Sequence, residues 1–206
     1  MQTFFDLNSP DKEIISSKEN FNVIELLKRN NKFSIIIGDK KSGKSFLAKK
    51  YSKFNEAELI FEHSASKKYA KKVYLDLNQL PLNEESFFHF IQYFITQNLG
   101  LTIFTSTNLL NLDSTINFIP DTLSRLKSFN IESIDKPGDE LFFRLVEKFL
   151  EKKSISVSVD IIKEIMIHIN RNYIDAYEAS ETINYLLYKN NHNINLSLIR
   201  KHYEQI

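Results

Sequence analysis

The sequence predicts an α/β protein in which a parallel sheet, covered by helices, is followed by a small all-helical subdomain. Short apolar runs typical of buried strands alternate with helical patterns between residues 33 and 134. Pro137 and Gly138 then break the pattern, and after them only helical periodicity remains. Alternation of strands and helices favours a parallel sheet, and the change to helices alone indicates a second subdomain.

The expected elements follow in chain order. After a polar arm, a short helix at 21–29 precedes the first strand. The expected strands are 33–37, 58–61, 73–76, 101–104 and 129–134, and the other helices among them are 45–54, 84–98 and 120–127. The helical part comprises 139–153, 159–170, 173–190 and 196–204, with Asp160 and Ser197 near helix starts, where such residues cap free N–H groups. This divides the chain into an N-terminal arm (1–20), a core (21–137) and a helical lid subdomain (138–206).

Bulk composition narrows the classes of function. The formal net charge is +1, so the chain has no overall attraction for nucleic acid and we expect no direct DNA binding. The lysine cluster within residues 67–72 is interpreted as a solvated flank. Cysteine is absent, which excludes disulfides and thiolate zinc sites and fits a cytoplasmic protein. The sequence contains neither a signal-peptide pattern nor an apolar run long enough to span a membrane.

The segment Gly38–Ser45 fits the phosphate-binding P-loop pattern G-x-x-x-x-G-K-[ST], between an expected strand and an expected helix. Such a loop aims backbone N–H groups at a phosphate, where the helix dipole also favours negative charge. We expect Lys44 to reach the β- and γ-phosphates of ATP or ADP, and the Ser45 hydroxyl to ligate Mg²⁺. The candidate nucleotide-binding residues are Gly38, Lys41, Ser42, Gly43, Lys44, Ser45 and Phe46. Lys41 stands where many such loops carry glycine.

The motifs after this loop resemble, in their order, those of the replication initiator DnaA and its AAA+ relatives. Val73–Asp76 resembles a Walker B strand, which implies that Asp76 holds the water shell of Mg²⁺ opposite Ser45. Glu84–His89 resembles an E-E-x-F-F-H helix. Leu101–Thr107 resembles the sensor I strand, with Thr105, Ser106 and Thr107 as sensor positions. The resemblance runs from about residue 10 to the end of the sequence, and the helical remainder matches the AAA+ lid.

Residues Asp121–Leu126 resemble the L-x-S-R-[FL] box of the same family. The resemblance implies that Arg125 acts in trans, as an arginine finger towards a neighbour's nucleotide. The competing interpretation is a surface arginine in a short helix.

A DnaA-like AAA+ module without the DnaA N-terminal and helix-turn-helix domains resembles the layout of the Hda family. Hda-like proteins bind the DNA polymerase sliding clamp and stimulate ATP hydrolysis by DnaA. The resemblance therefore implies the clamp and DnaA as partners, and it leaves a homodimer open. In the arm, Gln2–Leu7 is similar to the clamp-binding hexamer Q-L-x-L-x-[FL], with Gln2, Phe4, Phe5 and Leu7 as candidate contacts. Thr3 and Phe5 depart from this pattern, because both stand where it has leucine.

Two departures from the family predict weak or absent hydrolysis. Leu77 occupies the position at which active AAA+ ATPases carry a second carboxylate, which orients the attacking water. The lid arginine that touches the γ-phosphate aligns with Tyr177, and Arg171 lies six residues earlier in the sequence. We therefore expect a nucleotide-binding regulator of replication initiation with little ATPase activity of its own. Two alternatives stay open: an active P-loop ATPase such as a loader, and a degenerate AAA+ adaptor or DnaA anchor without a nucleotide role.

Overall fold

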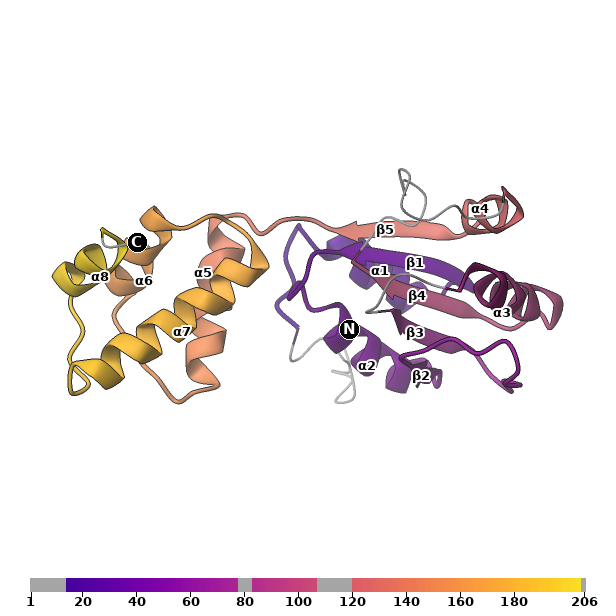
Figure 1. Ribbon diagram of the computed structural model, residues 1–206, viewed down its shortest axis with the longest axis horizontal. Helices are drawn as coiled ribbons and strands as arrows, with labels where there is room; N and C mark the ends of the chain where they lie inside the picture. Colours follow the sequence, from indigo (N-terminus) through magenta and orange to yellow (C-terminus); the bar gives the residue numbers. More distant parts are fainter. Residues whose placement is uncertain (1–13, 78–82, 107–119, 205–206) are drawn as a thin grey trace, which may run out of the picture. The chain divides into compact units, whose positions relative to one another are not determined.

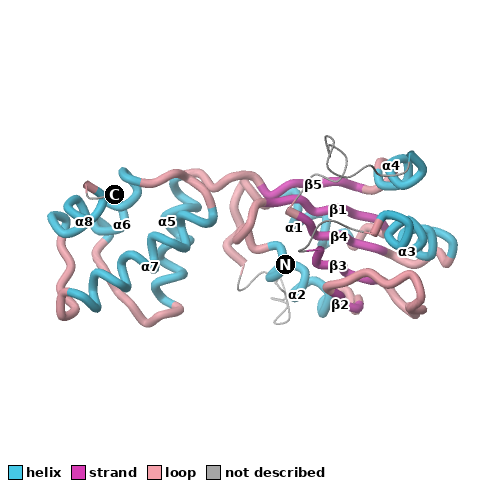
Figure 2. The backbone as a smooth tube through the Cα atoms, viewed as in Figure 1, coloured by secondary structure: helices cyan, strands magenta, loops and turns pink. Residues whose placement is uncertain are grey.

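The computed structural model describes residues 14–77, 83–106 and 120–204 (Figure 1). The chain forms two compact units, the first ending at Asp135 and the second beginning at Lys136. Within the described residues, the first unit contains all the strands and the second is built of helices and loops (Figure 2).

The first unit is organised around a parallel five-stranded sheet with the order β2-β3-β4-β1-β5. Its strands are β1 (Phe33–Gly38), β2 (Glu58–Ile60), β3 (Val73–Leu77), β4 (Leu101–Thr105) and β5 (Asn130–Ile134). All residues of β3 and β4 are buried, as expected for strands covered on both faces. The predicted α/β class and its parallel sheet are confirmed, and each strand begins and ends within one residue of its expected bounds.

Helices cover the two faces of this sheet: α1 (Phe21–Arg29), α2 (Lys44–Phe54), α3 (Glu84–Thr96) and α4 (Pro120–Leu126). α3 packs Phe87, Phe90, Ile91 and Phe94 in one apolar cluster with alternate residues of β3 and β4. Successive side chains of a strand point to opposite faces, so the β3 residues outside this cluster face α2. Tyr74 is one of them, and its hydroxyl accepts a hydrogen bond from the Asn55 side chain at the end of α2 (2.6 Å).

Lys72 connects the start of β3 with the turn before β1. Its ammonium group donates to Asn30 Oδ1 (2.8 Å) and lies 5.3 Å over the Tyr74 ring. Burial of this side chain lowers the pKa of Lys72 to about 8. Elsewhere in the lysine cluster, Lys67 donates to Glu58 Oε1 at 2.7 Å. These two lysines therefore make contacts within the fold.

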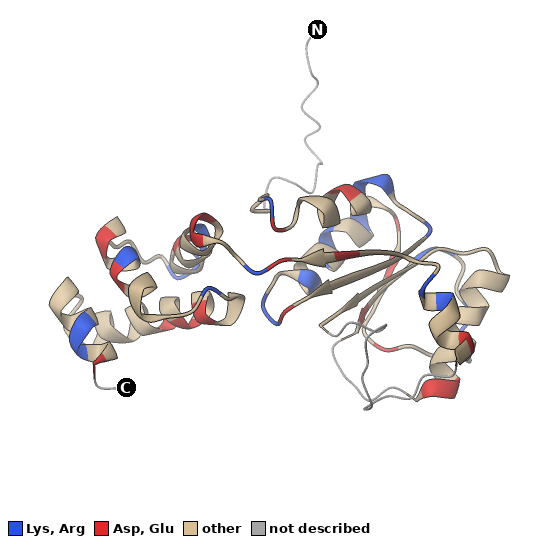
Figure 3. Cartoon of the chain, turned by 90° about the horizontal axis from the view of Figure 1, so that it is seen from above, with Lys and Arg blue, Asp and Glu red and all other residues tan. Residues whose placement is uncertain are grey.

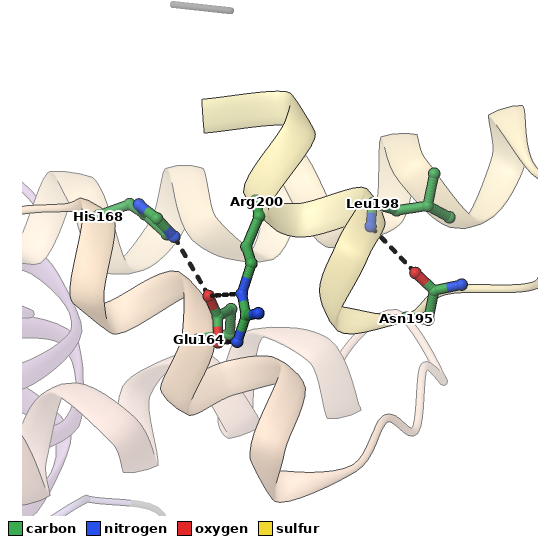
Figure 4. Close-up of polar contacts among 5 residues, drawn as sticks. All are labelled: Glu164, His168, Asn195, Leu198 and Arg200. Carbon is green, nitrogen blue, oxygen red and sulfur yellow. Dashed lines mark hydrogen bonds and ion pairs between the residues drawn. The ribbon is translucent and has the colours of Figure 1, made fainter. Parts of the chain in front are cut away.

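The second unit packs α5 (Asp139–Glu151), α6 (Val159–His168), α7 (Tyr173–Lys189) and α8 (Leu196–Tyr203) around one apolar cluster. α8 buries only Ile199. An ion pair strengthens its attachment: Arg200 donates from Nε to Glu164 Oε1 (2.7 Å) and from Nη2 to Oε2 (3.1 Å), as Figure 4 shows. The hydrogen bonds from Arg200 lower the pKa of the Glu164 carboxyl group. His168 lies 3.4 Å from the same carboxylate and stacks on Tyr203.

Helix capping differs from the sequence-based expectation in this unit. Ser158, and not Asp160, precedes α6, and its side chain forms no capping hydrogen bond. Asn195, and not Ser197, caps α8 by accepting a hydrogen bond from Leu198 N at 3.0 Å (Figure 4). Each predicted cap was wrong by two residues, because the periodicity of apolar residues does not fix the first turn of a helix.

Among the helices that the structure describes, none combines the length and the apolar character that a membrane span requires. Figure 3 shows basic and acidic residues interspersed along both units.

Candidate nucleotide-binding site

The segment Gly38–Ser45 joins the carboxyl end of β1 to the first turn of α2, which is the predicted strand–loop–helix arrangement. Gly43 precedes the helix with φ 93°, a left-handed conformation that glycine adopts without steric cost, and its carbonyl accepts a hydrogen bond from Leu47 N (2.9 Å). The first N–H groups of α2 have no intrahelical partner, and they therefore form a favourable site for a phosphate.

Close packing explains why the loop begins with glycine. A Cβ at Gly38 would lie 2.7 Å from Ser42 Oγ and 3.2 Å from Ile134 Cβ in the adjacent strand β5. Ser42 Oγ is buried and has no hydrogen-bond partner among the described residues. Lys41 has φ 67°, also in the left-handed region, which costs a residue with a side chain about 1–2 kcal/mol. This backbone conformation is the physical reason why glycine is suited to position 41.

Lys44 and Asp76 are the two buried charged residues at the site, 7% and 1% exposed. The Lys44 ammonium donates to the carbonyls of Gly38 (2.7 Å) and Asp39 (2.8 Å) within its own loop. Burial lowers the pKa of Lys44, and the charges of Asp76 and Asp39 act in the opposite direction. Neither carboxylate oxygen of Asp76 has a hydrogen-bond partner among the described residues. A buried carboxylate without a partner is costly, so this arrangement suits a cation or ordered water from outside the chain.

The residues present fit the magnesium ion that the sequence predicts. Mg²⁺ binds oxygen ligands, retains several waters and usually takes only one or two protein ligands besides phosphate. Ser45 lies exposed in the first turn of α2, and Asp76 offers two oxygens without partners. The structure shows no cluster of three metal-ligating side chains among its described residues. A magnesium ion at this site would therefore share its coordination between Ser45, waters held by Asp76 and the nucleotide.

The carboxyl ends of three adjacent strands meet beside the loop. Thr105, the last residue of β4, lies opposite Ile37 of β1 and opposite Leu77 of β3. It is buried, whereas Ser106 after it is exposed. The predicted sensor positions 105 and 106 therefore lie between the P-loop strand and the Asp76 strand. Thr107 and the arm residues Gln2, Phe4, Phe5 and Leu7 lie outside the described residues.

Phe46 follows Ser45 in α2 and is 38% exposed. The Lys50 ammonium lies 5.6 Å over its ring. The Phe46 ring is thus accessible to solvent beside the phosphate-binding turn. Its role in nucleotide binding stays a prediction.

Leu77 faces the opposite side of the sheet from Asp76. It is 5% exposed and belongs to the apolar cluster that includes Phe87 and Phe90 of α3. The first turn of α3 carries two acidic residues, Glu84 and Glu85, but position 77 itself holds a side chain that can neither accept a proton nor bind water.

Arg125 lies in the last turn of α4, shortly before the amino end of β5 (Figure 1). Gly38, where the P-loop starts, pairs with the last residue of the same strand, Ile134. Arg125 and the P-loop are therefore associated with opposite ends of β5. The arginine guanidinium lies 5.3 Å from the centre of the Phe88 ring, and its Nε is buried without a hydrogen-bond partner among the described residues. Nothing in the local sequence indicates this contact, because it depends on how α3 and α4 pack.

The lid positions singled out in the sequence make contacts within the second unit. Arg171 donates to the carbonyls of Met166 and Ile169 (2.5 and 2.9 Å) and forms an ion pair with Asp139. The ring of Tyr177 packs edge-on against Phe149, with centroids 5.6 Å apart. Arg171 is therefore already engaged and does not replace the arginine missing at position 177.

Comparison with known proteins shows which proteins share this fold. No protein-family model and no curated protein matches the sequence. Domain III of the replication initiation protein DnaA from Thermotoga maritima superposes with a TM-score of 0.71 at 12% identity, covering 93% of this chain and 95% of that one. AMPPCP-bound DnaA from Aquifex aeolicus gives 0.64 at 15% identity, covering 91% of this chain and 68% of that one. RuvB from Thermotoga maritima gives 0.69 at 13% identity, with coverages of 96% and 71%.

The chain thus has the α/β fold of the AAA+ P-loop domains of DnaA and RuvB, with a helical C-terminal part. The DnaA-like AAA+ fold expected from the sequence is confirmed. Assignment to the Hda family stays a prediction.

Replacing Leu77 with the missing acid should be unfavourable. Leu77→Glu places a carboxylate in an apolar cluster and is expected to lower the free energy of unfolding by about 2 kcal/mol or more. The matched control Leu77→Met preserves volume and polarity and should cost less than about 1.5 kcal/mol. Urea denaturation of the three proteins measures the difference. Equal stability of the glutamate variant and the wild type would mean that position 77 reaches the solvent at the strand end.

Proposed function

We propose that this protein is a nucleotide-binding AAA+ regulator that holds Mg²⁺ with ATP or ADP and acts on a second AAA+ protein, with little turnover of its own. The observation that carries this proposal is the buried pair of charges, Lys44 and Asp76, beside a helix N-terminus at the carboxyl edge of the sheet. The unpartnered oxygens of Asp76 favour a function in which a cation is supplied with the ligand. The likeness to DnaA structures that contain AMPPCP agrees with this proposal.

Nucleotide binding requires Lys44 to exchange partners. In the structure its ammonium group donates hydrogen bonds to the carbonyls of Gly38 and Asp39. Phosphate oxygens would replace these two acceptors with charged ones, which form stronger hydrogen bonds with a lysine. Binding would therefore gain stronger hydrogen bonds from Lys44 to the charged phosphates. It would lose the two hydrogen bonds from Lys44 to the carbonyls of its own loop. Leu77 leaves the attacking water without a general base or orienting group, so hydrolysis in this site is expected to be slow.

The nucleotide-binding proposal can be tested by calorimetric titration with ATP and ADP, with and without Mg²⁺. Lys44→Ala should weaken both affinities roughly 10-fold or more, because hydrogen bonds between charged groups are lost. Asp76→Asn should mainly remove the gain in affinity that Mg²⁺ provides. The control Lys49→Ala changes an exposed lysine of the same helix and should leave binding unchanged. Unchanged affinity in the Lys44 variant would refute the site, and steady ATP turnover would favour an active motor resembling RuvB.

We propose that the second protein is DnaA and that Arg125 is supplied in trans to the ATP that DnaA holds. The support is the position of Arg125 at the end of β5 opposite its own P-loop, and a guanidinium that forms no hydrogen bond or ion pair with any described residue. Arginine delocalises its charge and binds phosphate oxygens with two donors, so a placed guanidinium stabilises the charge of phosphoryl transfer.

Arg125→Ala should abolish stimulation of ATP hydrolysis by DnaA, since a finger contributes roughly 10³–10⁵-fold in systems of this kind. Hydrolysis of radiolabelled ATP bound to DnaA, in the presence of DNA-loaded clamp, measures this effect. Arg144→Ala is a matched control, because Arg144 is an exposed arginine of the second unit. Stimulation by the Arg125 variant at the wild-type rate would exclude the finger role.

We further propose that Gln2–Leu7 tethers the protein to the sliding clamp. The support comes from the sequence, in which Phe4, Phe5 and Leu7 form an apolar group on an otherwise polar arm. An extended peptide that buries such side chains gains roughly 1.5–3 kcal/mol from each one, before the cost of ordering the arm. Three such side chains give at most about 9 kcal/mol before that cost, so the arm by itself should bind with micromolar affinity at best.

Deleting residues 1–8 should remove clamp binding and leave nucleotide affinity unchanged. Phe5→Ala should cause most of the same loss, whereas Asp6→Ala, which changes a polar neighbour, should have a small effect. Size-exclusion chromatography with purified clamp measures the complex. Co-elution of the truncated protein with the clamp would place the tether elsewhere.

A further inference from the structure

We propose that Phe88 is a positioning residue, which holds the guanidinium of Arg125 in the orientation needed for its reaction in trans. This inference rests on the proposed function of Arg125 and adds a specific structural cause for its efficiency.

The geometry joins two helices. Phe88 lies in the second turn of α3, and Arg125 in the last turn of α4. The central guanidinium carbon lies 5.3 Å from the centre of the Phe88 ring, within the range of a cation–π interaction. Both side chains are half-buried, so the contact is partly protected from water.

The backbone of Arg125 is held separately from its side chain. The Arg125 carbonyl accepts hydrogen bonds from Ser128 Oγ (2.6 Å) and Ser128 N (3.0 Å), which close the last turn of α4. At the far end of the Arg125 side chain, the contact that the structure describes is the one with the Phe88 ring. Asp121 lies one turn earlier in α4, and the structure, which describes both residues, shows no ion pair between it and Arg125.

Other arginines of the protein show what a structural arginine looks like here. Arg171 donates to two carbonyls and a carboxylate, and Arg200 forms a two-fold contact with Glu164. Arg171 also lies 5.3 Å over the Phe142 ring, but its N–H donors are occupied. Among the described residues Arg125 has the aromatic contact alone, which binds the cation without using up its N–H donors. A stacked guanidinium keeps both its charge and its hydrogen-bonding edge for an anion, and the anion in question is a triphosphate held by another subunit.

Positioning has a kinetic signature. Holding a catalytic group in place lowers the entropy lost in the transition state, and it affects the maximal rate more than the affinity between the two proteins. Phe88→Leu keeps an apolar side chain but removes the ring face. We expect it to lower the maximal rate of stimulated hydrolysis roughly 3- to 10-fold, which is the range for losing a partly buried cation–π contact.

The experiment compares full-length Phe88→Leu, Phe88→Tyr, Arg125→Ala and wild-type protein, with DnaA carrying radiolabelled ATP and DNA-loaded clamp as the probe. The maximal rate and the half-saturating concentration of the regulator are measured separately. Phe61→Leu is the matched control, because it removes a phenylalanine ring that is 60% exposed. In each protein that retains Arg125, the Nε–H resonance of this residue reports stacking directly, because the Phe88 ring current shifts it.

Of the three variants that retain Arg125, only Phe88→Leu should show a lower maximal rate and a displaced Nε–H resonance. Its half-saturating concentration should be unchanged, and Phe88→Tyr should restore the rate. A wild-type rate for Phe88→Leu, with no activity in Arg125→Ala, would overturn positioning and leave the finger intact. Equal losses in the leucine and tyrosine variants, or a shifted half-saturating concentration, would show a general structural role and overturn it as well. Wild-type stimulation by Arg125→Ala would instead refute the proposed function itself.

Discussion

The candidate site depends on the register in which β4 pairs with β1 on one side and with β3 on the other. This pairing places Ile37, Thr105 and Leu77 in one row at the carboxyl edge of the sheet. The phosphate-binding turn starts directly after this row, and Asp76 lies one residue before it. A shift of one residue in β3 would turn Asp76 towards the apolar cluster under α3 and Leu77 towards α2. The chemistry of the site is therefore determined by strand pairing before any loop geometry contributes.

Two opposing requirements meet at the carboxyl end of β3. Position 76 buries an anion that has no hydrogen-bond partner in the described chain, while position 77 contributes an apolar side chain to the core. An active ATPase needs a second polar group at the position of Leu77, and such a group would pack less well in the apolar cluster. This protein has packing there instead, which agrees with the proposal that the site binds a nucleotide with little turnover.

Much of the fold could be predicted from the sequence, because buried parallel strands are continuous apolar runs and the Gly43-Lys44-Ser45 turn occurs where a strand meets a helix. The position of Asp76 followed from the same pattern. The order of the strands, with β4 between β1 and β3, could not be derived from local sequence, because it arises from long-range pairing. For the same reason nothing in the sequence associated Phe88 with Arg125, or indicated that the loop carbonyls hold Lys44. The helix caps at Asp160 and Ser197 were misplaced because neighbouring polar residues suit the first turn equally well.

The contact between Gly38 and Ile134 links the phosphate-binding turn to the connection between the two units. Ile134 ends β5, and the next residue, Asp135, donates its N–H to the Glu19 carbonyl at 2.9 Å before the second unit begins at Lys136. The first residue of the turn is thus in van der Waals range of the strand end from which the helical unit extends. A residue larger than glycine at position 38 would meet Ser42 Oγ at 2.7 Å and Ile134 Cβ at 3.2 Å. Every residue except glycine carries a Cβ, so a smaller side chain at position 134 would not make room for it. Glycine at position 38 is therefore a condition for keeping the end of β5, from which the chain continues into the second unit, close to the phosphate-binding turn.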